Sequence, residues 1–156
     1  MRAVLTVSAV LVLLAVTWVL AEPMQVHVDI KPQSCPNPLN VKSRGILTAA
    51  ILGAEAFDVN TVDTTSVMLA GVAAIRCSTE DVAAPVAEPG DCRCTDAGPD
   101  GFMDLVLKFN TPDIAAALGP VNDGDQVVVS LTGSLTDGTV ISGSDCVVII
   151  KKGMAD

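Results

Sequence analysis

The sequence predicts an all-β fold, a β-sandwich that carries one short helix. Short segments with alternating or continuous apolar residues recur along the chain, and turns rich in glycine and aspartate separate them. Signals for helices are scarce, so a layered arrangement of helices on a sheet is not indicated. Within residues 24–152 no repeat of fixed period and no low-complexity linker divides the chain.

The first 21 residues have the pattern of a secretory signal peptide. Arg2 precedes an uncharged apolar stretch, and Ala21 supplies the small residue at the expected cleavage site before Glu22. The alternative is an uncleaved membrane anchor, because the apolar run approaches the ~20 residues of a spanning helix. We expect residues 1–21 to be a signal peptide and residues 22–156 to form a single domain. That domain is expected to be secreted, outside the cell or in its envelope, without membrane contact after cleavage.

Two segments predict strands by different patterns. Residues 25–31 alternate, which predicts one half-buried strand. Its apolar side carries Val26, Val28 and Ile30, and its polar side carries His27, Asp29 and Lys31. Residues 46–52 are continuously apolar, which predicts a fully buried strand, with a short helix as the alternative. Further short strands are expected at 66–69, 102–109, 127–131 and 146–150.

Prolines and glycines predict the connections. Pro32, Pro36 and Pro38 indicate an extended loop, and residues 78–101 indicate a long loop of the kind that is usually functional or disordered. One helix is expected at 113–118, with Thr111 as N-cap, Pro112 in the first turn and Gly119-Pro120 as its end. Turns are expected at Asp137-Gly138 and at Gly143-Ser144.

Charge and aromatic content limit the classes of partner. The chain has 18 acidic and 9 basic residues, a net charge of −9, which repels the phosphate backbone and makes nucleic acid an unsuitable partner. There is no tyrosine, and Trp18 lies in the expected leader, so only three phenylalanines remain in the domain. A carbohydrate-binding face built on stacked aromatic rings is therefore poorly supported.

Five cysteines lie in the expected domain: Cys35, Cys77, Cys92, Cys94 and Cys146. Their spacing does not match a zinc site, and export permits disulfides. Cys92 and Cys94 would face the same side of a strand and could compete for Cys77, while a Cys35–Cys146 bond would tie the start of the domain to its last strand. The odd number leaves one thiol free or bonded to another chain, and the pairing itself stays open.

Residues 96–104 resemble a calcium loop. Asp96, Asp100 and Asp104 occupy its first, fifth and ninth places, Gly101 the sixth, and Phe102 would supply the seventh-place carbonyl oxygen. The third place is Gly98 and the twelfth is Leu107, so further oxygens would have to come from Asp81, Asp91 or water. The alternative is an aspartate- and glycine-rich turn that leads into a strand. Ca²⁺ is thus the expected cofactor, if any metal binds.

Catalytic motifs are not indicated. No Gly-x-Ser-x-Gly elbow or phosphate-binding loop is present, and His27 lies alone on the polar side of its strand. Glu80-Asp81 could form a carboxylate pair, but sugar-stacking aromatics are missing. Residues 122–125, Asn-Asp-Gly-Asp, are most simply a turn at the start of a strand, with a metal ligand set as the alternative. We therefore expect a protein that is not an enzyme.

Several strings in fixed order resemble a recurrent extracellular module of bacteria and archaea. Residues 28–40, VDIKPQSCPNPLN, resemble its opening DIKPGSxPNPLN, and Gln33 replaces the usual glycine, which should alter only the local turn. Residues 46–58, 80–82 and 100–105 resemble its later motifs, so the resemblance extends over residues 26–150. The module is similar to immunoglobulin-like or cohesin-like β-sandwiches, and it often occurs near dockerin-like or thrombospondin-type calcium repeats. Members often carry Asp or Asn where this chain has Gly98. This departure of the chain from the family pattern bears on the calcium site.

Together these observations predict a secreted, non-catalytic binding or scaffolding module of the cell exterior, stabilised by disulfides and with calcium as its candidate ion. The expected partner is an extracellular protein or a surface polymer. The alternatives are a purely structural, disulfide-stabilised domain without metal and a secreted hydrolase.

Overall fold

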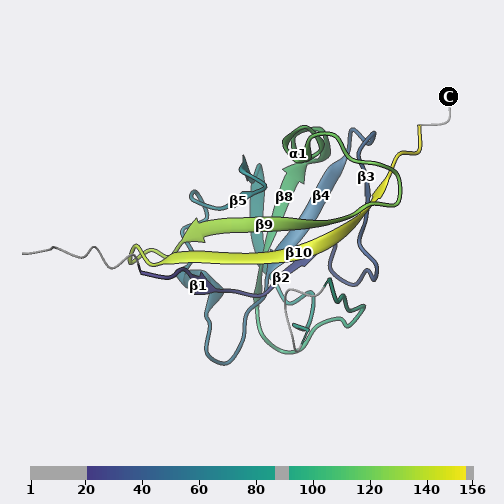
Figure 1. The fold of residues 1–156 in the computed structure, drawn as a ribbon. Helices are drawn as coiled ribbons and strands as arrows, with labels where there is room; N and C mark the ends of the chain where they lie inside the picture. Colours follow the sequence, from purple (N-terminus) through teal and green to yellow (C-terminus); the bar gives the residue numbers. More distant parts are fainter. Residues whose placement is uncertain (1–20, 87–91, 154–156) are drawn as a thin grey trace, which may run out of the picture.

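The computed structural model describes residues 21–86 and 92–153. Two β-sheets pack face to face, and one α-helix lies at one end of the sandwich (Figure 1). This arrangement confirms the predicted all-β sandwich with one short helix. The signal-peptide and anchor predictions fall on residues 1–20, outside the described residues. In the described part of the chain, no helix is both long enough and apolar enough to span a membrane.

The smaller sheet has four antiparallel strands in the order β2 (Val28–Ile30), β4 (Ile46–Ile51), β8 (Asp104–Asn110) and β7 (Arg76–Glu80). Strand β4 confirms a strand at 46–52, but it is not fully buried as predicted, because Ile46 is 51% exposed. Strand β8 confirms the strand predicted at 102–109, although it begins only at Asp104. Strand β7 was not predicted. All five of its side chains are exposed, so its sequence has no apolar alternation to reveal it. The predicted long loop therefore begins at Asp81, after this strand.

The larger sheet is built on the hairpin of β9 (Gln126–Ser134) and β10 (Val140–Ile150), which turns at Asp137-Gly138 as predicted. Strands β5 (Met68–Leu69) and β6 (Val72–Ala73) extend it beyond β9. Two strands pair in parallel with β10 near its opposite ends, β1 (Met24–Gln25) and β3 (Pro38–Asn40). The prolines before β3 predicted only a loop, and a three-residue strand was missed.

The predicted strand at 25–31 is in fact two strands in two different sheets. Val26 N–H donates to the Ser142 carbonyl of the larger sheet at 2.9 Å, and the His27 carbonyl accepts from Leu52 N–H next to the smaller sheet at 2.9 Å. The chain thus crosses from one sheet to the other between these two residues. It crosses back before β3, so β2 is a short excursion into the second sheet.

Gly143 permits this crossing. It lies inside β10, so the turn predicted at Gly143-Ser144 is wrong. A Cβ atom on Gly143 would lie 2.4 Å from the Val26 carbonyl oxygen and 2.6 Å from Cγ2 of Val28. Such distances are far shorter than van der Waals contact, so only glycine lets the crossing chain lie so close to β10.

The core fills the space between the two sheets. Its largest completely buried side chains include Phe109, Ile30, Ile51, Leu69, Leu107 and Leu131. Helix α1 (Thr111–Leu118) closes one end through Ile114, which is fully buried. The N-cap is Asn110, not Thr111 as predicted, because Thr111 is already helical and its N–H donates to the Gly45 carbonyl at 3.0 Å. Gly119 ends the helix at a φ of 70°, as predicted. One turn of 3₁₀ helix covers Val59–Thr61.

Replacing Gly143 by alanine should destabilise the domain by about 1–3 kcal/mol, because the added methyl group overlaps the backbone of the crossing segment. Urea unfolding measures this change as a shift in midpoint. Gly98→Ala is the matched control, because its Cβ would meet only one atom, at 4.0 Å. Equal midpoints for the two variants would contradict the role given to Gly143.

Candidate functional site

Most residues that the sequence singles out lie at the end of the sandwich opposite α1. There the long loop that joins β7 to β8 lies below β2 and β10 (Figure 1). A cavity of about 20 Å³ lies at this place. It is lined by His27 and Asp29, by residues 92–95 of the loop, and by residues 144–146 of β10. Its volume is close to that of one water molecule, far below the ~300–1,000 Å³ of a site for an organic ligand.

Two disulfides fasten the loop to the sandwich. Cys35 bonds to Cys94, and Cys92 bonds to Cys146, while Cys77 is free and exposed on β7. The suggested Cys35–Cys146 bond and the suggested competition for Cys77 are therefore both wrong. Cys92 has a φ of 53°, so the chain turns there, and Cys92 and Cys94 do not share one face of a strand. Each of them consequently reaches a different partner.

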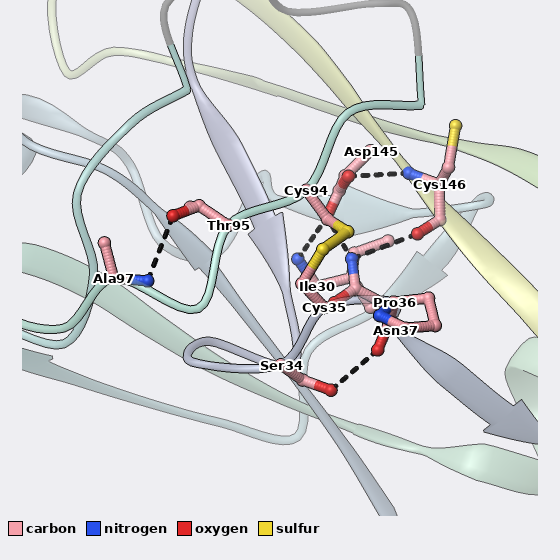
Figure 2. Close-up of a disulfide and its surroundings, with 10 residues drawn as sticks. All are labelled: Ile30, Ser34, Cys35, Pro36, Asn37, Cys94, Thr95, Ala97, Asp145 and Cys146. Carbon is pink, nitrogen blue, oxygen red and sulfur yellow. Dashed lines mark hydrogen bonds between the residues drawn. A yellow bond between two sulfur atoms is a disulfide. The ribbon is translucent and has the colours of Figure 1, made fainter.

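The carboxylate of Asp145 joins the two sheets beside the Cys35–Cys94 disulfide (Figure 2). Its Oδ2 accepts from Ile30 N–H of β2 at 2.7 Å and from the Asn37 side-chain amide at 2.9 Å, and its Oδ1 accepts from Cys146 N–H at 2.7 Å. The Asn37 amide also donates to the Cys146 carbonyl at 3.1 Å. One half-buried carboxylate thus holds β2, β10 and the segment that returns to β3.

The carboxylate of Asp104 holds the start of the long loop in a similar way, by accepting hydrogen bonds. It is fully buried, and its carboxylate accepts from three backbone N–H groups: Gly53 at 2.9 Å, Val82 at 2.8 Å and Ala83 at 3.2 Å. Buried N–H groups outside a sheet ladder need such acceptors, and charged acceptors make the stronger bonds. Asp104 therefore anchors the loop to the connection after β4.

The predicted calcium ligands do not come together as a ligand set. Asp96 is exposed, Asp104 is directed to the three N–H groups of the interior, and Oδ1 of Asp100 accepts from Phe102 N–H at 3.0 Å. Asp81 accepts from the N–H groups of residues 100 and 101. Phe102 follows in the exposed turn, and Asp91 lies outside the described residues. In this arrangement Asp81, Asp100 and Asp104 each accept backbone N–H groups.

Residues 21–86 and 92–153 contain no group of three or more Asp, Glu, His or Cys side chains that could hold a metal ion. The stretch at 122–125 is a turn before β9, as its simpler interpretation predicted. Its carboxylates accept backbone N–H groups, from Lys151 to Asp123 at 2.7 Å and from Asn122 to Asp125 at 2.6 Å. Calcium binding stays a prediction, which melting with and without a chelator would test.

Asp29 is the residue of this region whose importance the sequence did not indicate. It was expected on the polar side of a strand, but the loop covers it and leaves it 7% exposed. Its Oδ2 has no hydrogen-bond partner in the described part of the chain, and neither does Oδ1 of the buried Asn37. Burial raises the pKa of Asp29 to about 7, and the charges of Asp145 and Asp104 add to the rise. Burial also raises the pKa of Asp145, against the opposing effect of its hydrogen bonds from Ile30 and Cys146.

Comparisons with known proteins give no relative. No family model matches the chain, and neither a curated protein nor a solved structure matches it. The chemistry of this region must therefore be judged from the geometry above. That geometry consists of carboxylates used as internal hydrogen-bond acceptors, a cavity for about one water, and a loop held by two disulfides.

The disulfide pairing makes a clear prediction for peptide mapping. Arg93 separates Cys92 from Cys94, so trypsin should place these two cysteines in different peptides. After free thiols are blocked with N-ethylmaleimide, we expect residues 22–42 linked to 94–108 and residues 77–93 linked to 109–151. Cys77 should carry the only maleimide of the domain. A link between residues 22–42 and 109–151 would instead show the Cys35–Cys146 bond and contradict the structure.

The buried acids predict that stability falls as pH rises. The pKa of Asp29 is higher in the folded chain than in the unfolded chain, so between about pH 4 and about pH 7 the folded state keeps a proton that the unfolded state loses. The free energy of unfolding should therefore be lower at pH 8 than at pH 5, by on the order of 2 kcal/mol after allowing for solvent screening.

Asp29→Asn should remove most of this dependence and raise the melting temperature at pH 8 by several degrees. Asp96→Asn is the matched control, because it removes the same charge from an exposed position in the same region. Calorimetry at both pH values measures the effect. If both variants keep the wild-type slope of stability against pH, Asp29 is not the group responsible.

Proposed function

We propose that this protein is a secreted, non-catalytic binding or scaffolding module of the cell exterior. The pair of disulfides is the observation that carries this proposal. Cys92–Cys146 ties the long loop to the last strand, and Cys35–Cys94 ties it to the segment between β2 and β3. Disulfides form and persist in oxidising compartments outside the cytoplasm, which agrees with the leader predicted at residues 1–21.

The geometry of the titratable residues supports a role in binding more than one in chemistry. The cavity beside Asp29 and Asp145 has room for about one water molecule. Their carboxylates, with that of Asp104, lie against the backbone or under the loop and not in a cleft of substrate size. By contrast, the outer surface of the four-stranded sheet has an open groove of about 330 Å³, which is large enough for side chains of a partner.

The resemblance to the bacterial and archaeal extracellular module gives further support. Gln33 stands where that module commonly has glycine, and its φ is 68°, in the left-handed region that glycine favours. The backbone at this position thus agrees with the glycine of the motif. The resemblance implies an accessory or adhesion role alongside other secreted proteins.

A purely structural domain is the alternative that shares most of these features, and two measurements separate it from a binding module. The full chain, produced in its own organism, should appear outside the cytoplasm with Glu22 as its first residue in mass spectrometry. The labelled secreted protein should then bind the envelope fraction of that organism saturably, and unlabelled protein should displace it.

Two outcomes would count against the proposal. Retention in the cytosol with Met1 still attached would contradict secretion. Binding that never saturates, or that unlabelled protein does not displace, would favour the purely structural alternative. The same secreted protein after reduction and alkylation is the control, because loss of the disulfides should release the loop and lower the stability by several kcal/mol.

A further inference from the structure

The groove on the four-stranded sheet lies on the face that points away from the core. Side chains alternate across the sheet, and Ala49 and Leu107 are fully buried between the sheets. Their neighbours Thr48 and Lys108 therefore project outward, and both line the groove. Apolar groups of Pro32, Ile46, Val82 and Val106 form much of the rest of its lining.

A row of basic side chains crosses this face. Lys108 lies opposite Arg76 on β7 and opposite Thr48 on β4. Lys31, just after β2, donates its N–H to the Thr48 carbonyl at 2.8 Å and lines the same groove. Since adjacent strands are about 4.8 Å apart, the row from Lys31 to Arg76 extends over about 15 Å. It runs across the strands of the sheet.

These cations have no acidic partner within residues 21–86 and 92–153. The Lys31 ammonium donates to the Pro38 carbonyl at 3.0 Å, and the Lys108 ammonium donates to Oγ1 of Thr48 at 2.8 Å. Each ammonium has three N–H donors, so each keeps donors available for a ligand. Arg76 is exposed and has no side-chain partner among the described residues. In a chain of net charge −9, three neighbouring cations that outnumber the one carboxylate of the groove, Glu80, form a local positive site.

We propose that this groove binds an extended acidic peptide segment of a partner protein, an inference that rests on the binding role proposed above. Carboxylates of the segment pair with Lys31, Lys108 and Arg76, and an apolar side chain between them fills the hollow beside Ile46, which is 51% exposed. Glu80 lines the groove as well. It repels a uniform polyanion, whereas a peptide can place a neutral residue against it, so the peptide fits better than an acidic polysaccharide.

The test uses the disulfide-bonded protein and a fluorescein-labelled hexapeptide, Glu-Val-Glu-Val-Glu-Val, followed by fluorescence anisotropy in low salt. The double variant K31Q/K108Q should weaken binding about tenfold, because two charge pairs are lost. The double variant K42Q/K152Q removes the same charge from lysines that do not line the groove and should bind as the wild type does. Ile46→Ser should weaken binding without changing the charge. The hexapeptide Lys-Val-Lys-Val-Lys-Val should not bind.

Three results would overturn the inference. Equal weakening in the two double variants would show attraction by overall charge. Tighter binding of polygalacturonate than of the acidic peptide would identify an acidic polymer as the ligand. If the wild-type protein and K31Q/K108Q bind the envelope fraction equally, the module binds through a surface other than this groove. That result leaves the proposed function intact. If neither of them binds that fraction saturably, the proposed function itself fails.

Discussion

The hydrogen bonds to the Asp145 carboxylate are the interaction on which the rest of this structure depends. The chain leaves one sheet after β1, pairs briefly in the other as β2, and returns as β3, so its N–H groups at the crossings have no continuous ladder of partners. A carboxylate on β10 supplies an acceptor for Ile30 N–H, and it also accepts from the side-chain amide of Asn37. Gly143, two residues before it, provides the space for the crossing. Charge and close packing are thus concentrated within a few residues of one strand.

The use of buried carboxylates as internal acceptors has an electrostatic cost, because it brings like charges close together. Burial raises the pKa of Asp29, and the carboxylates that Asp145 and Asp104 bring toward the covered end of the sandwich raise it further. Burial and like charges at short range both destabilise the ionised form, so the pKa values of Asp29 and Asp145 are raised at the end of the domain that contains these internal acceptors. The two disulfides lie at this same end. They hold the loop over the acidic residues whether or not Asp29 is ionised.

The parts of the fold that were predicted correctly depend on local patterns. Strand β4 follows from a continuous apolar run, β8 from the two-residue spacing of Leu105, Leu107 and Phe109, and the end of α1 from Gly119-Pro120. The errors arise where a residue's role is set by a distant segment. The strand at 25–31 divides because Gly143 lies against it, β7 is fully exposed and has no apolar pattern, and the cysteine pairing depends on the turn at Cys92. Asp104 matched a calcium loop by spacing, yet its role is decided by N–H groups of Gly53, Val82 and Ala83, which no local spacing reveals.

The use of acidic side chains inside the domain affects the charge of the outer groove. Several acids of this acidic chain accept backbone hydrogen bonds and are directed inward or along their own turns, as Asp104, Asp145 and Asp81 show. They are therefore not available to neutralise Lys31, Lys108 and Arg76, which the pairing of β4, β8 and β7 aligns on the opposite face of the sheet from the core. A surface cation without a partner gains little from the folded state itself, because water solvates it as well in the unfolded chain. Its value lies in what it attracts, and here Lys31 and Lys108 line an apolar hollow while Arg76 lies beside Lys108 on the neighbouring strand.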